Sequence, residues 1–384
     1  MIIAKTTQSQ LLAALQAVAG IVERRSPMPV LSNVLLRRSG GGGATELVTS
    51  DLEVQLHTRA ELGGDAPEFA TTVAIRKVID ILRTLPADQQ LSLEENDDSR
   101  IILKAGKSRF TLQTLPAADF PLVQDAPGFS EPFRVPQKTL RTLLAQVSFA
   151  MAVKDVRYYL NGVLFVADGT ELKLVSTDGH RLAFGSATLD IEVPHQEVIL
   201  PRKTVLELIR LLPDAGAPLP EGAEVPMIEM SFAANQARFE FGAMSFITKL
   251  VEGKFPDYTR VIPQNNTNTV TLGRATLLAG LQRSAILTDD KQRGVRLNFS
   301  EGALRISAGS AEQEEAVDEI EIDYTAAPLE LSFNVNFLTE MLTGMSGHDM
   351  VTFAMKNAGD TNNSVLITVP DDANFKYVVM PMRL

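Results

Sequence analysis

The chain has 384 residues, 45% of them hydrophobic, no cysteine, and a formal net charge of −11. This length suffices for two or three domains, each with a buried core. The lack of cysteine excludes disulfides and cysteine-ligated zinc and is typical of a reducing compartment. No basic region followed by an apolar run opens the sequence, and no apolar segment reaches membrane-spanning length. We therefore expect a soluble cytoplasmic protein with no membrane partner.

One short amphipathic helix is predicted three times along the chain. Over 137–147 the apolar residues Leu140, Leu143, Leu144 and Val147 recur at helical spacing, with Lys138 and Arg141 on the other side. The same pattern occurs over 11–18 and over 277–281. The copies lie about 130 residues apart, which is the size of an ordinary domain. The repeat predicts three α+β domains in one chain, each with two helices packed on antiparallel strands.

The first third continues with a strand pair, a second helix and a further set of strands. The glycine run Gly40–Gly43 lies between two strands with no helix after it, so it predicts a flexible hairpin tip and not a phosphate-binding loop. The second helix ends at Pro86. The predicted elements are strands 33–37 and 46–49, helix 76–85, and strands 91–94, 100–104 and 109–115.

The second and last thirds repeat this order. Strands 162–166 and 171–176 are predicted to form a hairpin across Asp168-Gly169, a favourable turn dipeptide. Breaks between the thirds are expected at 124–131, rich in Pro and Gly, and at 263–268, rich in Asn. The remaining elements are helix 202–212, strands 227–232, 237–241, 245–250, 296–299, 304–309 and 315–324, helix 336–344, and strands 350–355, 364–369 and 376–380.

The charge is unevenly distributed. The helix-like windows carry more Lys and Arg than Asp and Glu, so the remainder of the chain is strongly acidic. These windows are 5–25, 76–85, 137–157, 201–212, 274–293 and 336–345. One interpretation is a positive surface on the helices that faces a polyanion. The alternative is that Lys and Arg are simply good helix formers.

The two ends of such an array differ in charge as well. Repeated units that stack edge to edge leave one strand edge free at each end. The late strand of the first third carries Lys104, Lys107 and Arg109 beside Phe110 and Leu112. The last third carries an acidic run, Glu312, Glu314, Glu315, Asp318 and Glu319, with Ile286 and Leu287 nearby in sequence. Complementary ends predict a head-to-tail homodimer that can close into a ring. The alternative for the acidic run is a solvated loop.

Several motifs, taken together, make the chain resemble the bacterial sliding clamp family, the beta subunits of DNA polymerase III. The resemblance covers the whole chain in order. The motifs are Thr114–Pro121, Tyr158–Gly162, Thr177–Leu182, Leu200–Lys203, Gly253–Tyr258 and Val378–Leu384. The resemblance implies three clamp domains over 1–127, 132–262 and 268–384, with helices lining a ring and strands outside. It implies a homodimer that encircles duplex DNA and tethers replicative and repair polymerases.

The resemblance also assigns residues to three surfaces. Those expected to face DNA are Arg25, Arg76, Tyr158, Tyr159, Arg202 and Lys203. Those expected to line a cleft between the second and third domains, where peptides of the polymerase alpha subunit, the clamp loader and other partners bind, are Leu160, Thr177, Gly179, His180, Arg181, Leu182, Pro256, Arg260, Val261, Phe337, Val378, Met380, Pro381, Met382 and Arg383. The expected dimer interface comprises Lys77, Lys107, Arg109, Phe110, Leu112, Ile286, Leu287, Glu312, Glu314 and Glu315.

An enzyme is the main alternative from the residues themselves. Asp178, His180 and Arg181 could form an acid-base or phosphoryl-transfer site, but Asp178-Gly179 is also a common turn dipeptide. The four histidines fall in separate segments with no metal-ligand spacing. The pairs Asp289-Asp290 and Asp371-Asp372 could bind a cation, although surface turns often carry such pairs. We predict no catalysis, no metal and no cofactor.

Overall fold

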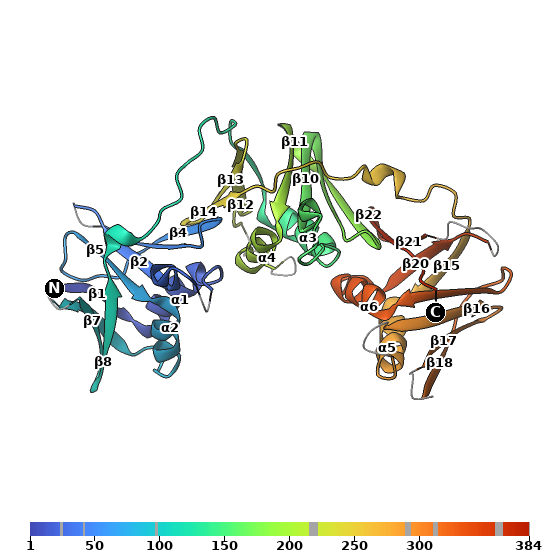
Figure 1. The fold of residues 1–384 in the computed structure, drawn as a ribbon, viewed down its shortest axis with the longest axis horizontal. Coiled ribbons are helices and arrows are strands. Elements are labelled where there is room, and N and C mark those ends of the chain that lie inside the picture. Colours follow the sequence, from blue (N-terminus) through green and yellow to red (C-terminus); the bar gives the residue numbers. More distant parts are fainter. Residues whose placement is uncertain are drawn as a thin grey trace. The chain divides into compact units, whose positions relative to one another are not determined.

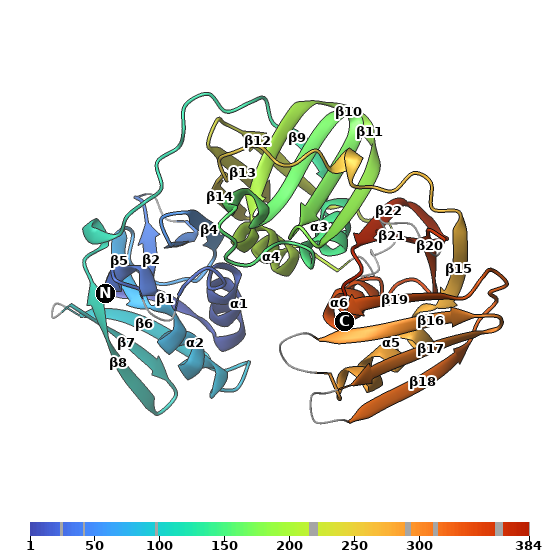
Figure 2. The same ribbon diagram turned by 45° about the vertical axis from the view of Figure 1, so that its right-hand side comes forward.

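A computed structural model describes the chain except for residues 24–25, 41–42, 97–98, 215–221, 289–292, 310–313, 358–363 and 384. The chain divides into two compact units (Figures 1 and 2). One comprises residues 1–137 and 210–250, and the other comprises residues 138–209 and 251–384. The three predicted domains divide the chain differently, because a sheet runs across the first predicted boundary. Their boundaries stay a prediction.

The first unit is built on a twelve-stranded sheet of order β1-β6-β7-β8-β5-β2-β3-β4-β14-β13-β12-β9. Strands β4 and β14 come from different thirds of the chain and pair antiparallel, with Leu56 opposite Phe246. The strands are β1 (Ile2–Thr7), β2 (Asn33–Arg38), β3 (Thr45–Ser50), β4 (Val54–Ala60), β5 (Phe69–Ala74), β6 (Gln90–Asn96), β7 (Arg100–Ala105), β8 (Ser108–Leu115), β9 (Phe133–Pro136), β12 (Met227–Phe232), β13 (Gln236–Phe241) and β14 (Met244–Lys249). Edge-to-edge stacking, expected from the repeat, therefore joins the first third to the second.

Two helices of the first unit, α1 (Gln8–Val18) and α2 (Ile75–Arg83), pack against this sheet and against each other. Helix α1 begins with a capping box, in which the Thr7 hydroxyl accepts from the Gln10 amide and the Gln10 side chain accepts from the Thr7 amide. It buries Leu11, Leu15 and Val18. The apolar spacing read from the sequence thus corresponds to the buried face.

The second unit contains two sheets. The six-stranded sheet has the order β10-β11-β22-β21-β20-β15, and the four-stranded sheet has the order β18-β17-β16-β19. Strand β11 pairs with β22, so the second and last thirds also join edge to edge, with Leu182 opposite Val378. The strands are β10 (Gly162–Thr177), β11 (Arg181–Pro201), β15 (Asn268–Gly273), β16 (Gly294–Ser300), β17 (Ala303–Gly309), β18 (Glu315–Glu321), β19 (Leu329–Asn334), β20 (Met350–Met355), β21 (Val365–Val369) and β22 (Asp372–Val379).

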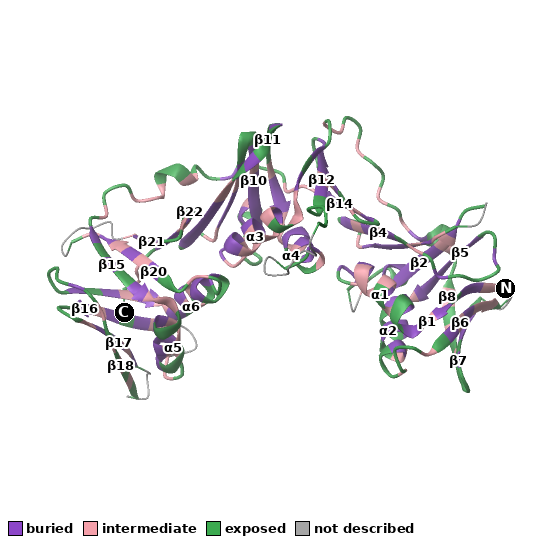
Figure 3. Ribbon diagram, turned by 180° about the vertical axis from the view of Figure 1, so that it is seen from behind, coloured by how far each residue is buried: buried purple, intermediate pink, exposed green. Residues whose placement is uncertain are grey.

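The remaining helices repeat the pattern of one buried and one exposed face. They are α3 (Gln137–Ser148), α4 (Arg202–Leu211), α5 (Arg274–Ala285) and α6 (Val335–Gly344). Helices α5 and α6 pack against each other, and α5 lies on the four-stranded sheet. Figure 3 shows the helices partly buried and partly exposed. All six helices predicted from the sequence are present, with ends shifted by a few residues.

One predicted hairpin is wrong. Residues 162–177 form a single strand, β10, which pairs along its length with β11. Asp168-Gly169 does not reverse the chain; Gly169 has a positive φ of 57°, and the register of the pairing shifts on both sides of it. The positive φ of Gly169 therefore accompanies an irregularity within the β10–β11 ladder and not a chain reversal. The chain reverses instead at Asp178-Gly179, where Thr177 lies opposite Leu182.

Other differences concern strands that the sequence analysis did not predict: β1, β4, β5, β9, β11, β15 and β19. The hairpin across the glycine run is present, since Leu35 of β2 lies opposite Val48 of β3. The tip residues Gly41 and Gly42 lie outside the described residues. The last strand ends at Val379, directly before Met380-Pro381. The strand predicted over 376–380 thus ends one residue earlier, next to a proline that cannot continue the ladder.

Candidate functional site

An apolar cleft in the second unit brings together most of the residues expected at the peptide site. It encloses about 220 Å³. Its lining is Arg157, Leu160, Thr177, Gly179, His180, Arg181, Leu182, Phe255, Pro256, Tyr258, Val261, Val378 and Met380. Sites that enclose a whole small molecule usually measure about 300–1,000 Å³. The cleft is therefore of a size to hold part of a larger ligand, such as an apolar side chain or two.

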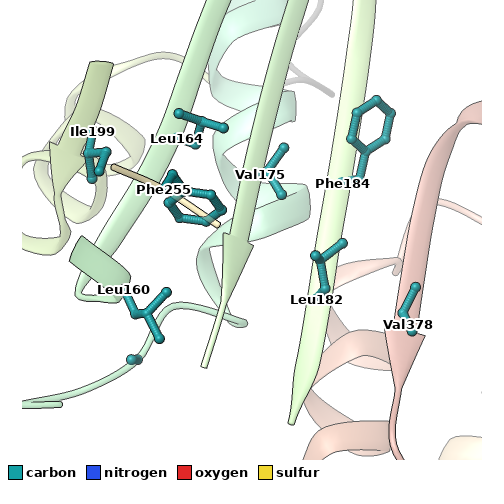
Figure 4. Packing of buried hydrophobic residues seen from close by; sticks show 9 residues of the cluster. Leu160, Leu164, Val175, Leu182, Phe184, Ile199, Phe255 and Val378 are labelled. Atoms are coloured by element: carbon teal, nitrogen blue, oxygen red, sulfur yellow. The ribbon is translucent and has the colours of Figure 1, made fainter. Parts of the chain in front are cut away.

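A cluster of buried apolar residues forms the floor of this cleft. Leu160, Leu182, Phe255 and Val378 belong to both the cluster and the cleft lining. Figure 4 shows Leu182 on β11, Val378 on β22, and Leu160 and Phe255 on segments beside these strands. Tyr258 and Val261 pack against the cluster from the segment that leads to β15. Because well-packed side chains back the cleft, its apolar surface is preformed.

The turn from Thr177 to Arg181 supplies one wall. One carboxylate oxygen of Asp178 accepts hydrogen bonds from the amides of His180 (2.9 Å) and Arg181 (3.0 Å). Gly179 has a φ of 93°, which side chains rarely adopt, and a Cβ there would lie 3.0 Å from the Arg157 guanidinium. The turn thus needs aspartate and glycine for its geometry.

Arg181 ties this turn to α6. Only 8% of its side chain is exposed, and it pairs with Asp178 at 3.0 Å and with Glu340 at 2.6 Å. Its guanidinium lies 4.5 Å from the centre of the Phe337 ring. Burial opposes the charged form, but Tyr377, Glu340 and Asp178 outweigh it and raise the pKa of Arg181. The Arg181 cation is therefore held in place both by its own turn, through Asp178, and by α6, through Glu340.

The C-terminal segment closes the other side of the cleft. The Met380 amide donates to the His180 carbonyl (3.0 Å), and the Met382 amide donates to the Ser332 carbonyl (2.7 Å). Met380 itself is 42% exposed. Methionine is flexible and polarisable, so its side chain can adapt to ligands of different shape.

Ten of the fifteen expected cleft residues line the cleft, and the other five lie elsewhere. Arg260 lines a separate polar hollow. Phe337 stacks on His180, with ring centres 6.4 Å apart, and so supports the wall from behind. Pro381, Met382 and Arg383 follow Met380 in the sequence but do not line the apolar cleft. Arg157, Phe255 and Tyr258 also line the cleft, although the sequence analysis did not predict them there. Phe255 and Tyr258 belong to the family motif Gly253–Tyr258, which could have indicated their role.

The residues of the catalytic alternative, Asp178, His180 and Arg181, have structural roles in the turn from Thr177 to Arg181. Asp178 uses one oxygen to cap the turn and the other to pair with Arg181. His180 packs on Phe337. Among the described residues, no group of three or more His, Asp or Glu side chains lies close enough to hold a metal ion. Asp371 pairs with His348 at 2.9 Å, whereas Asp289 and Asp290 lie outside the described residues.

The residues expected to face DNA are accessible where the structure describes them. Arg76 and Tyr158 are exposed, whereas Tyr159, Arg202 and Lys203 are half-buried. The two tyrosine rings meet edge to face, 5.9 Å apart. Arg25 lies outside the described residues.

Part of the helix charge is used within the fold. Arg274 donates to the carbonyls of Leu342 and His348 near the end of α6, where the helix dipole favours a cation. Arg283 pairs with Asp318 of β18. Lys77 and Lys138 are exposed and make no recorded ion pair in the described part of the chain. Some cations of the helices therefore stabilise the fold, and others are exposed and can contact a ligand.

The two expected dimer surfaces include strands with an unpaired side. Strand β18 is the end strand of the four-stranded sheet, and its residues alternate between exposed and half-buried. Strand β8 lies between β7 and β5, but among the described residues it pairs with β5 only at Leu115 and Thr114, so Ser108–Gln113 have one open side there. Phe110 and Leu112 are half-buried, Lys107, Arg109, Glu314 and Glu315 are exposed, and Leu287 is half-buried. Ile286 is 78% exposed, and Glu312 lies outside the described residues.

None of the described helices is both long enough and apolar enough to cross a membrane.

Comparison with known proteins identifies the family. Models for the N-terminal, central and C-terminal domains of the DNA polymerase III beta subunit match residues 4–124, 134–257 and 259–383. The beta sliding clamp of Pseudomonas aeruginosa is 44% identical over 377 residues, which cover 97% of this chain and 98% of that protein. The Escherichia coli beta sliding clamp is 39% identical, with 98% of both covered.

A solved structure agrees. The crystal structure of the DNA polymerase III subunit beta from Pseudomonas aeruginosa matches with a TM-score of 0.87 and 42% identity, covering 100% of both chains. Fold and matches together define a three-domain clamp protein of replication. The chain belongs to the DNA polymerase III beta subunit family, the bacterial beta sliding clamps. The resemblance drawn from the sequence motifs is confirmed, and processive DNA replication is the process that this family serves.

Proposed function

We propose that two copies of this chain close into a ring around duplex DNA and that the ring tethers polymerases by binding short peptides in the apolar cleft. The cleft is the observation that carries the proposal. It combines a preformed apolar floor, the adaptable Met380 and a fixed cationic wall at Arg181. A peptide with one or two apolar side chains and polar backbone groups suits this combination.

The open edges of β8 and β18 support the dimer. Each edge has unpaired main-chain groups, and pairing between edges is a common way for two chains to associate. Lys107 and Arg109, beside and in β8, are opposite in charge to Glu314, Glu315 and Glu319, beside and in β18. A head-to-tail contact between these edges in two chains satisfies both edges at once and closes a two-fold ring.

The charge distribution supports DNA binding by topology. Duplex DNA carries one negative charge per about 1.7 Å of axis, so it is attracted to exposed cations such as Lys77 and Lys138. The net charge of −11 opposes tight wrapping. A closed ring needs no tight phosphate contacts to stay on DNA, and weak attraction allows it to slide. The homodimer, the duplex and the partner polymerases form one consistent proposal.

Two methionines allow a matched test of the cleft. Met380 and Met350 are both 42% exposed, but only Met380 lines the cleft. We expect Met380→Ala to weaken binding of a fluorescent partner peptide about 5- to 30-fold, since truncating one buried contact residue costs about 1–2 kcal/mol. Met350→Ala should leave the dissociation constant unchanged in the same anisotropy titration.

Removal of Met380–Leu384 should abolish peptide binding while the protein stays dimeric by sedimentation. The deletion also removes the hydrogen bonds that hold the segment to His180 and Ser332. Unchanged peptide affinity after this deletion would refute the cleft as the partner site.

A further inference from the structure

A second, polar hollow lies beside the apolar cleft. It encloses about 110 Å³ and shares Val261 with the cleft lining. Its other walls include two cations, Arg260 and Lys356, and the polar side chains of Gln264 and Ser364. No carboxylate lines it among the described residues. The apolar cleft and this small cationic hollow thus meet at Val261, and the chemistry of the surface changes from one to the other.

Hydrogen bonds fix the walls of this hollow. The Asn266 side-chain amide donates to the carbonyls of Ala354 and Ser364, both at 2.9 Å. These two bonds fasten the segment that carries Arg260 and Gln264 to the ends of β20 and β21, beside Lys356. The hollow is therefore formed by the fold itself and does not depend on a ligand to bring its walls together.

The two cations differ in how far they are already neutralised. Arg260 pairs with Asp257 at 3.0 Å, and both side chains are largely exposed. Lys356 is half-buried and makes no ion pair or hydrogen bond recorded among the described residues. A half-buried lysine with no anionic partner among the described residues attracts a nearby anion more strongly than a fully solvated one. Lys356 is thus the group that determines what the hollow attracts.

We propose that this hollow is a subsite for a carboxylate side chain, aspartate or glutamate, that flanks the apolar anchor of a partner peptide. The inference rests on the proposed peptide function of the cleft. A peptide whose apolar side chain fills the cleft continues past Val261 at one of its ends. There its acidic side chain reaches Lys356, with Arg260 and the polar side chains of Gln264 and Ser364 around it. Charge complementarity selects a carboxylate over a cationic or apolar side chain.

Peptide pairs that differ only in one group test the subsite. One peptide of each pair carries Asp or Glu next to the apolar anchor, and the other carries Asn or Gln. The acidic position is placed on either side of the anchor in turn. At one of these positions we expect the acidic peptide to bind about two- to five-fold more tightly, the range of a partly exposed ion pair. The preference should shrink as salt is added.

Variants of the dimeric protein assign that preference to one residue. In Lys356→Ala the acidic and amide peptides should bind equally, and in Lys356→Glu the order should reverse. The control is Lys254→Ala, which removes an exposed lysine that lines neither hollow and should keep the full preference. Each variant is also measured with a peptide that lacks the flanking residue, whose affinity should not change.

The outcomes separate the subsite from the cleft. If acidic and amide peptides bind the unaltered protein equally at both positions, or if the preference survives Lys356→Ala, the subsite is wrong and the cleft stands. If no peptide of either kind binds, the proposed function fails and the subsite fails with it.

Discussion

Arg181 is the residue on which the cleft most depends at the scale of single side chains. Its guanidinium is buried, and the fold supplies it with Asp178 from its own turn and Glu340 from α6. A buried charge that loses a partner is costly, because water cannot replace that partner. The ion pair thus links the shape of the cleft wall to the position of a helix from the last third of the chain.

Glu340→Ala should therefore destabilise the protein by about 1–2 kcal/mol, less than a fully buried pair because the Glu340 side chain is 47% exposed. Peptide binding should weaken as well, since Arg181 lines the cleft. The matched control is Glu330→Ala, an exposed glutamate of β19 with no recorded ion pair in the described chain. Chemical denaturation compares the two variants, and equal stability of both would argue against this role for Glu340.

Gly162 shows why a motif glycine is required. A Cβ at this position would lie 2.3 Å from the carbonyl oxygen of Leu200, in the strand paired with β10. Main-chain atoms of a sheet cannot move aside cheaply, so Gly162→Ala should cost about 2–3 kcal/mol. Gly347→Ala is the control, because a Cβ there meets nothing within 4 Å. A denaturation midpoint shared by Gly162→Ala and the parent would contradict the predicted clash.

Asp155 gives a prediction about pH. Hydrogen bonds from the Arg157 side chain and amide lower the pKa of Asp155 from 3.8 to about 2. A depressed folded pKa means that the carboxylate stabilises the loop above pH 4 and that this contribution is lost between pH 4 and pH 2. A carbon-detected NMR titration should give a midpoint near pH 2 in the parent and one near 4 after Arg157→Ala. A midpoint near 4 in both would sink the assignment.

The role of a residue in the cleft could be predicted from the sequence only where that residue belongs to a family motif. Leu182, Val378 and Met380 were placed in the cleft through family motifs, because on composition alone Val378–Met382 would read as an ordinary last strand. Arg157 carried no such signal; it reaches the cleft through a turn whose path depends on the Asp155 contact. The positions of Phe337, on α6, and Arg260, in the segment before β15, depend on packing between parts of the chain that are distant in the sequence, which spacing does not encode.

At the scale of elements, the helices were the most predictable parts because their apolar faces repeat over several turns. The failure at Asp168-Gly169 is instructive. Two Asp-Gly dipeptides lie close together, and either can reverse a chain. Leu172 and Leu174, which follow the first dipeptide, are buried and continue the ladder with β11. Partner choice across strands, which is a tertiary effect, decided between the two turns.

The missed strands have a similar cause. Strands β4 and β9 pair with segments that are distant in the sequence, β4 with β14 and β9 with β12. Their stability comes from a neighbour that the local pattern cannot reveal. The edges, in contrast, were visible as charge: a basic segment near β8 and an acidic segment near β18.

Those edges carry a prediction. Reversal of Lys107 and Arg109 to glutamate should weaken the dimer at least about tenfold, because like charges then face each other across the proposed contact. The control reversal is Lys254→Glu, which lies on neither edge. Adding Glu314→Lys and Glu315→Lys to the first variant should restore dimerisation. A sedimentation profile identical to the parent for the Lys107 and Arg109 variant would count against this interface.

At the scale of the whole molecule, the net charge alone pointed away from a DNA partner, whereas the distribution of charge along the chain pointed toward one. A net charge of −11 argues against a nucleic-acid partner until the basic residues are seen to concentrate in the helices. The triplicated pattern predicted a modular chain, and the strand pairings β4–β14 and β11–β22 show how consecutive thirds are joined. Closure of the array through a second chain follows as a proposal from its unlike ends.

Encirclement is best tested by retention on DNA of two shapes but identical sequence. Labelled dimer is loaded onto a closed circular duplex, free protein is removed, and one half of the sample is cut once by a restriction enzyme. The protein should stay on the circle for far longer than on the cut duplex, because a ring slides off a free end. Equal retention on circle and linear duplex would contradict a topological link, and with it the view that the chain acts as a closed ring.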